Sequence, residues 1–365
     1  MVMDNFSKER IYTMNKLSEI LASRDLPSLG FGAGVDPDKR RLELIDILSE
    51  HIYGYTPNFK SEVTAEVILD RKDVYGERGR SIGFNITATT PKGKFTFPLW
   101  LCYPKTDKKI PLMVYIHFDL RQPSGHTPDE EIFDRGVALA KIYYNDIMPD
   151  VRGDVSSAIA AHFPREEYGA SAWGQVGMWA WAASRALDHL LTLDVFDTEK
   201  IAIVGHSRLG KTALWCGAQD TRFTHVIANN AGCSGDAITR GKRGETIKDI
   251  TVTSWFCDKY RDYIGDGLQN MPFDQHFLLA AVAPRKLCIG AADLDIWADP
   301  WSEYLSCVAA SEAWEARGMD GFVHPDRLPN IGEVMHSGDI GFHLRSGDHQ
   351  LCRHDFMKYI DFLLQ

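Results

Sequence analysis

The chain has 365 residues, of which 44% are hydrophobic and 25% are charged, and its formal net charge is -10 at pH 7. This composition is that of a folded globular protein and excludes extensive disorder. The acidic balance argues against a nucleic-acid partner, because phosphate binding requires clustered lysine and arginine. The N-terminal stretch carries charges throughout and has no apolar run, so we expect neither a secretory signal, a membrane span nor a membrane partner.

The cysteines are odd in number and form no CxxC pair, and most of them lie in apolar runs. They predict buried free thiols rather than a disulfide framework or a zinc site. Free thiols favour a cytoplasmic location, although secretion or a periplasmic location stays open if a signal peptide was removed. No group of histidines and cysteines has metal-ligand spacing, and we expect neither a metal nor a cofactor. The seven cysteines are Cys102, Cys216, Cys233, Cys257, Cys288, Cys307 and Cys352.

Residues 1–57 predict an N-terminal helical extension, or cap, packed on the same domain. Residues 5–24 and 38–54 both show apolar residues at helical spacing. After residue 63 the period of the apolar residues changes to two, which predicts antiparallel strands. These candidate strands cover residues 64–70, 81–89 and 94–104.

The rest of the chain alternates between strands and helices. This order predicts an α/β fold with a mostly parallel central sheet, helices on both faces and antiparallel edge strands, over residues 58–365. Parallel sheets carry their functional loops at the carboxyl ends of the strands. The expected strands are 111–118, 139–145, 200–205, 225–230, 286–292 and 340–346, the expected helices are 174–193, one from 209, 300–318 and 352–364, and residues 145–172 are expected to form a long loop.

The segment IAIVGHSRLGKTALW supports two incompatible interpretations, both of which require a strand, a turn and a helix. In one, Gly205 to Gly210 resembles a nucleophile elbow that exposes Ser207, although the usual pattern is GxSxG and the second glycine comes one residue late. In the other, GHSRLGKT satisfies the phosphate-binding pattern GxxxxGKT, in which Lys211 would reach a nucleotide phosphate and Thr212 a magnesium ion. The next strand ends in asparagines rather than a metal-holding aspartate, which weighs against the nucleotide site.

Later residues favour the elbow. A carboxylate-rich loop with Asp293, Asp295 and Asp299 follows the strand at 286–292, and His349 follows the strand at 340–346. Serine, acid and histidine occur in this order in α/β hydrolases, so we predict that residues 58–365 form a catalytic domain of the α/β-hydrolase type. We therefore predict Ser207 as nucleophile, His349 as general base and Asp295 as the acid. Asp293 stays an alternative acid, whereas Asp299 precedes a proline and is more typical of a helix N-cap.

Several segments resemble the glucuronoyl esterases, carbohydrate esterase family 15, particularly their bacterial branch. The resemblance spans Trp173 to His354, and the first 110 residues show none. It implies cleavage of esters of 4-O-methyl-glucuronic acid, which join xylan to lignin alcohols. The segments are WAWAASRALDHL, GHSRLGKTALW, NNAGCSG, MPFDQHFLLAAVAPRKL, DIWADP and GDHQL.

The resemblance also implies roles for individual residues. Arg208 would stabilise the oxyanion through its backbone N–H and guanidinium, Lys211 and Glu245 would contact sugar hydroxyls, and Trp297 would form a wall of the sugar site. Many members of this family have a glutamate after the strand that follows the elbow, where this chain has Asn230. The carboxylate of the triad must then come from the loop that contains Asp295.

The sequence thus predicts a serine carboxylester hydrolase that acts on a uronate ester, either a small molecule or an oligosaccharide. Three alternatives stay open. The first is an acetyl-xylan or other short-acyl carbohydrate esterase on the same scaffold. The second is a P-loop nucleotide-binding protein, and the third is a sugar-binding relative without catalytic activity.

Overall fold

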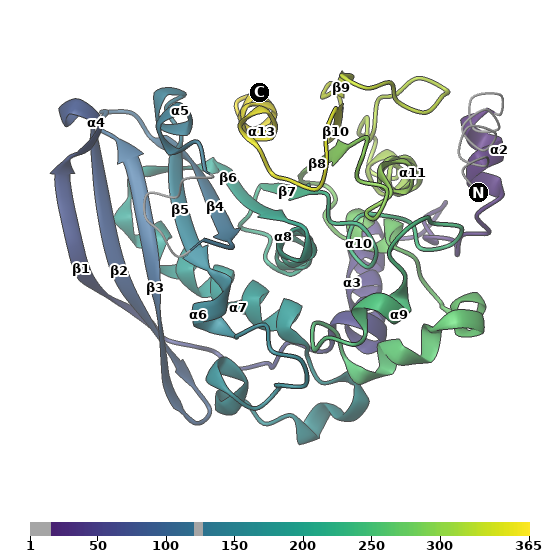
Figure 1. Ribbon diagram of the computed structural model, residues 1–365, viewed down its shortest axis with the longest axis horizontal. Coiled ribbons are helices and arrows are strands. Elements are labelled where there is room, and N and C mark those ends of the chain that lie inside the picture. Colours follow the sequence, from purple (N-terminus) through teal and green to yellow (C-terminus); the bar gives the residue numbers. More distant parts are fainter. Residues whose placement is uncertain (1–15, 120–126) are drawn as a thin grey trace, which may run out of the picture.

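The computed structural model describes residues 16–119 and 127–365, and a sheet of ten strands forms the centre of this part (Figure 1). Its strand order is β1-β2-β3-β5-β4-β6-β7-β8-β10-β9. The strands are β1 (Val63–Asp73), β2 (Gly79–Thr90), β3 (Gly93–Pro104), β4 (Ile110–His117), β5 (Ala138–Tyr143), β6 (Phe196–His206), β7 (His225–Asn229), β8 (Lys286–Ala292), β9 (Val334–Met335) and β10 (Ile340–Arg345).

The middle of the sheet is parallel and its edges are antiparallel, as predicted. Strands β5, β4, β6, β7, β8 and β10 run parallel to one another, whereas β1, β2 and β3 form an antiparallel wing and β9 pairs antiparallel with β10. Every residue of β7 is buried, as expected for a strand covered on both faces. In the outer strand β1, partly buried and exposed residues mix, because one face lies toward solvent.

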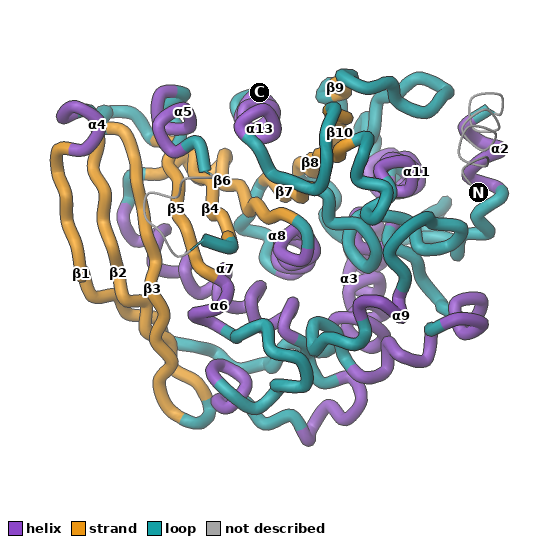
Figure 2. The backbone as a smooth tube through the Cα atoms, in the orientation of Figure 1, coloured by secondary structure: helices purple, strands orange, loops and turns teal. Residues whose placement is uncertain are grey.

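Helices cover both faces of the sheet, which completes the predicted architecture (Figure 2). Helices α5 and α13 pack on one face through the cluster that contains Ile132 and Phe356. The other helices lie mainly on the opposite face and share the larger apolar core. The helices on this opposite face include α3 (Pro37–Leu48), α7 (Gln175–Leu190), α8 (Arg208–Gln219), α10 (His276–Ala280) and α11 (Pro300–Ala310). The two helices on the other face are α5 (Asp129–Asp134) and α13 (Arg353–Leu363).

Short helices occupy the connections, including the segment 145–172 that was predicted as a loop. The predicted helix 300–318 is divided at Ser311 into α11 and α12. In the described ranges, no helix is both long and apolar enough to cross a membrane. The short elements are α4 (Val74–Glu77), α6 (Tyr144–Ile147), η2 (Ala158–His162), η3 (Glu166–Ser171), η4 (Leu191–Leu193), α9 (Ile247–Ile250), η5 (Asp258–Tyr263), η6 (Gly265–Asn270) and α12 (Glu312–Glu315).

The N-terminal segment contains α2 (Leu17–Ala22), α3 and the π-helical turn η1 (Ser49–Tyr53). Helix α3 begins with Pro37 after Asp36, whose side chain accepts hydrogen bonds from the amides of Asp38 and Lys39. Arg41 donates to the carbonyls of Ala281 and Ala218, which ties α3 to the sheet-covering helices. The predicted helix 38–54 is thus confirmed. Residues 5–15 of the predicted helix 5–24 lie outside the described residues. The boundary of the N-terminal extension at residue 57 stays a prediction.

Candidate active site

Ser207 forms the whole turn between β6 and α8, because β6 ends at His206 and α8 begins at Arg208. Its backbone has φ 56° and ψ -129°, a region that residues other than glycine rarely adopt. A Cβ atom on Gly205 would lie 1.9 Å from the carbonyl oxygen of Leu209, so only glycine lets the helix return so closely to the strand. This strained turn lifts the serine hydroxyl above the sheet, as in a nucleophile elbow.

The late glycine of the motif has a packing reason. At Gly210, a Cβ atom would lie 3.0 Å from the Cβ of Ala231 and 3.4 Å from the carbonyl oxygen of Asn229. Glycine is therefore used where α8 passes the end of β7, and the preceding Leu209 is buried in the core. The departure from GxSxG shifts the point of closest contact and leaves the serine turn intact.

The phosphate-binding interpretation does not fit this geometry. A P-loop needs several loop residues whose amides surround the phosphates, but here one residue separates strand and helix. The Thr212 hydroxyl donates to the carbonyl of Arg208 within α8, and Lys211 is buried. Neither side chain is placed to hold a nucleotide and its magnesium ion.

The structure brings Ser207, His349 and Asp295 into one hydrogen-bonded chain. Nε2 of His349 lies 2.8 Å from Oγ of Ser207, and Nδ1 lies 2.6 Å from Oδ2 of Asp295. The three residues follow β6, β10 and β8, whose carboxyl ends lie on the same side of the parallel sheet. The arrangement has the order and spacing needed for a base to activate a nucleophile while a carboxylate orients that base.

The surroundings of Asp295 keep its carboxylate charged and aligned. Asn230 donates from Nδ2 to Oδ2 at 2.6 Å, and the amide of Ala298 donates to Oδ1 at 3.2 Å. Burial by itself would raise the pKa of Asp295, but the hydrogen bonds from His349 and Asn230 outweigh burial and hold the pKa below its usual value. Asn230, at the position where the resemblance led us to look for a glutamate, therefore supports the acid, a role the sequence did not reveal.

The other two aspartates of this loop have separate tasks. Asp293 accepts from the amide of Gly347 at 2.8 Å and so holds the loop that contains His349. Asp299 accepts from the hydroxyl of Ser302 at 2.7 Å and from the amide of Arg243 at 2.8 Å. It also caps the first turn of α11, as its sequence context predicted. Among the three aspartates, Asp295 makes the hydrogen bond to His349.

His206 lies directly beside the candidate base, and sequence reasoning missed it. Its ring centroid is 4.6 Å from that of His349, and its Nδ1 donates to Oδ1 of Asn229 at 2.7 Å. Burial, and then the neighbouring His349, lower the pKa of His206 to about 4. His206 is therefore neutral at neutral pH and places no second positive charge next to His349.

Arg208 is held rigidly beside the nucleophile. Its guanidinium pairs with Oδ2 of Asp150 at 2.6 Å and lies 5.0 Å from the ring centroid of Phe118, 5.6 Å from that of Tyr144 and 5.2 Å from that of Trp255. Trp255 also donates to Oδ1 of Asp150 at 2.8 Å. The Arg208 amide lies in the first turn of α8, where N–H groups have no acceptor within the helix. This amide is available to a negative charge that develops at the serine.

The three residues predicted to contact substrate form a connected group, which we call the Lys211–Glu245–Trp297 group. Nζ of Lys211 donates to the carbonyl of Cys233 at 2.7 Å and to that of Ala231, and it lies 3.5 Å from Oε2 of Glu245. Nε1 of Trp297 donates to Oε1 of Glu245 at 3.2 Å. Lys211 is buried, whereas Trp297 is 54% exposed, so the group leads from the core to an open aromatic face.

Two further histidines, His276 and His117, take no part in the hydrogen-bonded chain of Ser207, His349 and Asp295. His276 is buried, and its Nε2 lies 2.9 Å from the carbonyl oxygen of Pro27. His117 is buried at the end of β4, and its Nδ1 accepts from the amide of Asp119 at 3.1 Å. All seven cysteines, each within the described part of the chain, are free thiols as predicted.

Comparison with known proteins places this geometry in a family. A family model described as "Glucuronyl esterase, fungi" matches residues 77–318. A carbohydrate esterase, MZ0003, from an unknown prokaryotic organism is 31% identical over 89% of this chain and 84% of its own length. The 4-O-methyl-glucuronoyl methylesterase of Hypocrea jecorina is 28% identical over 77% of this chain and 58% of its own length.

The likeness includes the three-dimensional structure. The glucuronoyl esterase from Solibacter usitatus superimposes with a TM-score of 0.81 at 30% identity, covering 93% of this chain and 97% of the other. The family match begins at residue 77, so it includes antiparallel strands in which motifs alone had shown no resemblance. The α/β-hydrolase architecture and the predicted resemblance are both confirmed, and the chain belongs to the glucuronoyl esterase family of carboxylic ester hydrolases.

Proposed function

We propose that this protein hydrolyses esters of glucuronic or 4-O-methyl-glucuronic acid in xylan and lignin-carbohydrate material, with Ser207, His349 and Asp295 as its catalytic triad. The observation that carries the proposal is the hydrogen-bonded chain from Ser207 through His349 to Asp295, at 2.8 Å and 2.6 Å. The name of the Hypocrea jecorina relative, 4-O-methyl-glucuronoyl methylesterase, supports this substrate class.

The reaction proceeds by two-step acyl transfer. His349 takes the proton of Ser207 as Oγ attacks the ester carbonyl, and Asp295 stabilises the resulting imidazolium. The Arg208 amide and its fixed guanidinium stabilise the tetrahedral oxyanion. His349 then gives the proton to the leaving alcohol, and water repeats the sequence on the acyl-enzyme. Each step uses side chains and one backbone amide of this chain together with water, and none requires a cofactor.

The position of the sugar distinguishes a uronate ester from an acetylated sugar. In a uronate ester the carbonyl belongs to the sugar, so the ring stays on the acyl side of Ser207 throughout the reaction. In an acetyl ester the acyl side is a methyl group, and the sugar leaves with the alcohol. The Lys211–Glu245–Trp297 group offers a carboxylate for sugar hydroxyls and an exposed ring for a sugar face. Such a group suits an acyl portion that is itself a sugar.

Lys211 contributes in two ways in this proposal. Its amino group faces Glu245, so it fixes and neutralises the carboxylate that meets the sugar, and it contacts a sugar hydroxyl through that same face. Because the proposed substrate is part of a polymer outside cells, the proposal favours an exported enzyme over the cytoplasmic location that the free thiols suggested.

The test is a panel of methyl glucuronate, benzyl glucuronate, acetylated xylose and a small aryl acetate. We expect the highest kcat/KM on the glucuronates. Lys211→Ala and Glu245→Ala should lower it by ~10-fold or more, since each lost hydrogen bond to a specific hydroxyl leaves a partner unpaired, worth ~1–3 kcal/mol. Both variants should lower kcat/KM on the small aryl acetate far less.

Lys248→Ala is the matched control, because it removes the same charge from an exposed position nearby. Lys248→Ala should leave kcat/KM on all four substrates unchanged. Equal or better activity on acetylated xylose, unaffected by Lys211→Ala and Glu245→Ala, would instead assign the protein to the short-acyl esterases.

A further inference from the structure

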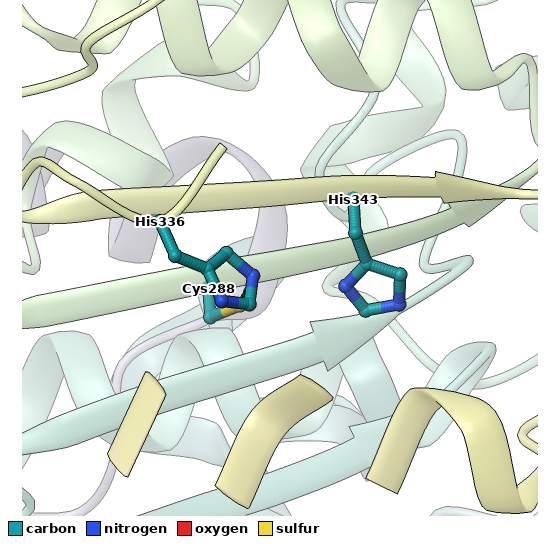
Figure 3. Close-up of side chains that lie close together, drawn as sticks. All are labelled: Cys288, His336 and His343. Atoms are coloured by element: carbon teal, nitrogen blue, oxygen red, sulfur yellow. Dashed lines mark hydrogen bonds between the residues drawn. The ribbon is translucent and has the colours of Figure 1, made fainter. Parts of the chain in front are cut away.

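A group of one cysteine and two histidines, of which Cys288 and His343 are completely buried, lies away from the triad, and we call it the Cys288–His336–His343 cluster. One potential ligand atom from each residue lies within 4.8 Å of the other two (Figure 3). Cys288 is on β8, His343 is on the neighbouring parallel strand β10, and His336 follows β9. Sequence spacing predicted no metal site because the sheet, rather than a local motif, brings these residues together.

His343 presents a lone pair to this cluster. The side chain is completely buried, and its Nε2 lies 2.9 Å from Oδ1 of Asp355. Asp355 is an acceptor here, because it also accepts from Nε of Arg345 at 2.9 Å, so Nε2 of His343 has the proton. Nδ1 is then the unprotonated nitrogen, and it has no hydrogen-bond partner. In Figure 3 the ring turns this side toward His336.

The other two ligand atoms are already spaced for a shared ion. Sγ of Cys288 lies 3.7 Å from Nε2 of His336. A tetrahedral zinc ion with Zn–S of about 2.3 Å and Zn–N of about 2.0–2.1 Å holds its sulfur and nitrogen ligands about 3.6 Å apart. Cys288 is completely buried, whereas His336 is partly exposed, which gives an ion a route from solvent.

We propose that Sγ of Cys288, Nε2 of His336 and Nδ1 of His343 bind a thiophilic divalent transition-metal ion, for which Zn²⁺ is the best match. One thiolate and two imidazoles are typical ligands of zinc, and water entering beside His336 supplies a fourth. On binding, the Cys288 thiol releases its proton to solvent and one metal–sulfur and two metal–nitrogen bonds form. Asp355 orients His343 from behind, as carboxylates do for metal-binding histidines.

The ion would join strands β8 and β10 independently of catalysis. Asp295 follows the first of these strands and His349 follows the second, so the site would stabilise the part of the sheet that carries two members of the proposed triad. The competing explanation is a hydrogen bond from the Cys288 thiol to Nε2 of His336 with no metal at all. Sulfur coordination distinguishes the two explanations, because the thiol keeps its proton only in the second.

The experiment is a titration of chelator-treated protein with Co²⁺, which gives a thiolate-to-cobalt absorption band when cysteine is a ligand. We expect a band that saturates at one ion per chain and disappears when Zn²⁺ is added. Cys288→Ser should abolish it, and His336→Gln should weaken binding by at least ~10-fold. Cys216→Ser and His324→Gln, which change residues outside the cluster, should keep the band. The exposed His349 cannot produce it, since a sulfur ligand is required.

Absence of the band in the wild type, or its persistence in Cys288→Ser, would overturn the proposal and leave the thiol hydrogen bond as the explanation. If Cys288→Ser does not fold, His336→Gln decides, because His336 is partly exposed and follows a two-residue strand. For that pair of proteins, one concentration of Zn²⁺ should raise the Tm of the wild type clearly more than that of His336→Gln. Equal increases in both would also overturn the proposal.

Discussion

The last part of the chain contains two histidine–aspartate pairs, which differ in the group that contacts the second ring nitrogen of the histidine. In His349–Asp295, Nδ1 contacts the carboxylate at 2.6 Å and Nε2 contacts Ser207. In His343–Asp355, Nε2 contacts the carboxylate at 2.9 Å and Nδ1 faces Cys288 and His336. A carboxylate fixes the proton on one nitrogen, and the group opposite decides what the histidine can do.

The two pairs also differ in solvent access. The side chain of His349 is 42% exposed, whereas that of His343 is 1% exposed. Asp295 receives hydrogen bonds from an amide side chain and a backbone amide, but Asp355 neutralises the buried guanidinium of Arg345. We therefore expect the exposed pair to govern activity and the buried pair to govern stability.

The largest effect should come from the exposed pair and its nucleophile. Ser207→Ala and His349→Ala should each lower kcat on a glucuronate ester by ~10⁴ or more, because the triad acts as one unit. Ser207→Ala should also abolish labelling by a fluorophosphonate probe, which a sugar-binding relative without catalysis would never show. Both variants should have the same midpoint of urea unfolding as the wild type, which shows that the fold is kept. Substantial turnover in either variant would contradict the assigned roles.

The next effect concerns the choice among three aspartates. Asp295→Asn should lower kcat by ~10³–10⁴, because only Asp295 fixes the proton on Nδ1 of His349. Asp293→Asn and Asp299→Asn should cost much less activity, since they hold a loop and cap a helix. Steady-state kinetics on all three variants measure this directly. If Asp293→Asn were inactive and Asp295→Asn nearly wild type, our assignment of the acid would be wrong.

These predictions rest on features that the sequence revealed to different degrees. The apolar runs of β4, β6 and β8 and the glycine before Ser207 are local signals, so the sheet, the elbow and the order of serine, acid and histidine could all be predicted. The donor role of Asn230 could not, because it depends on where two loops meet after β7 and β8. Neither could the Asp150–Arg208–Trp255 contact, since Asp150 and Trp255 lie in segments without periodicity.

Other features escaped prediction for a similar reason. Cys288, His336 and His343 come together only through the pairing of β8 with β10 and the turn after β9. The division of the predicted helix 300–318 at Ser311 also depends on a tertiary contact. The Ser311 hydroxyl accepts from the amide of Phe322 at 3.0 Å, a contact that no helical spacing encodes. Periodicity thus predicts the scaffold, whereas side-chain meetings across the sheet require the fold itself.

A smaller effect is expected from the buried pair. Asp355→Asn should lower the free energy of unfolding by about 3 kcal/mol, because it leaves the Arg345 guanidinium buried without its counter-charge. Urea denaturation measures this change. The matched control, Asp194→Asn, breaks an exposed ion pair with Lys109 and should change stability little. A greater loss of stability in Asp295→Asn than in Asp355→Asn would reverse the contrast between the two pairs.

The smallest expected effect is a change with pH in the difference in unfolding free energy between the wild type and Asp355→Asn. Burial alone would raise the pKa of Asp355, but the hydrogen bonds from His343 and from the amide of Cys352, together with the charge of Arg345, lower it to about 2. The unfolded value is about 3.9, so Asp355 stabilises the fold above that pH and loses its contribution as the pH falls toward about 2. Asparagine does not titrate, and every other carboxyl group is common to both proteins. The difference in unfolding free energy between wild type and Asp355→Asn should therefore shrink by ~2 kcal/mol between pH 5 and 2. Urea denaturation at intermediate pH values follows this change, and a constant difference would show that the carboxyl group is not held in its charged form by the fold.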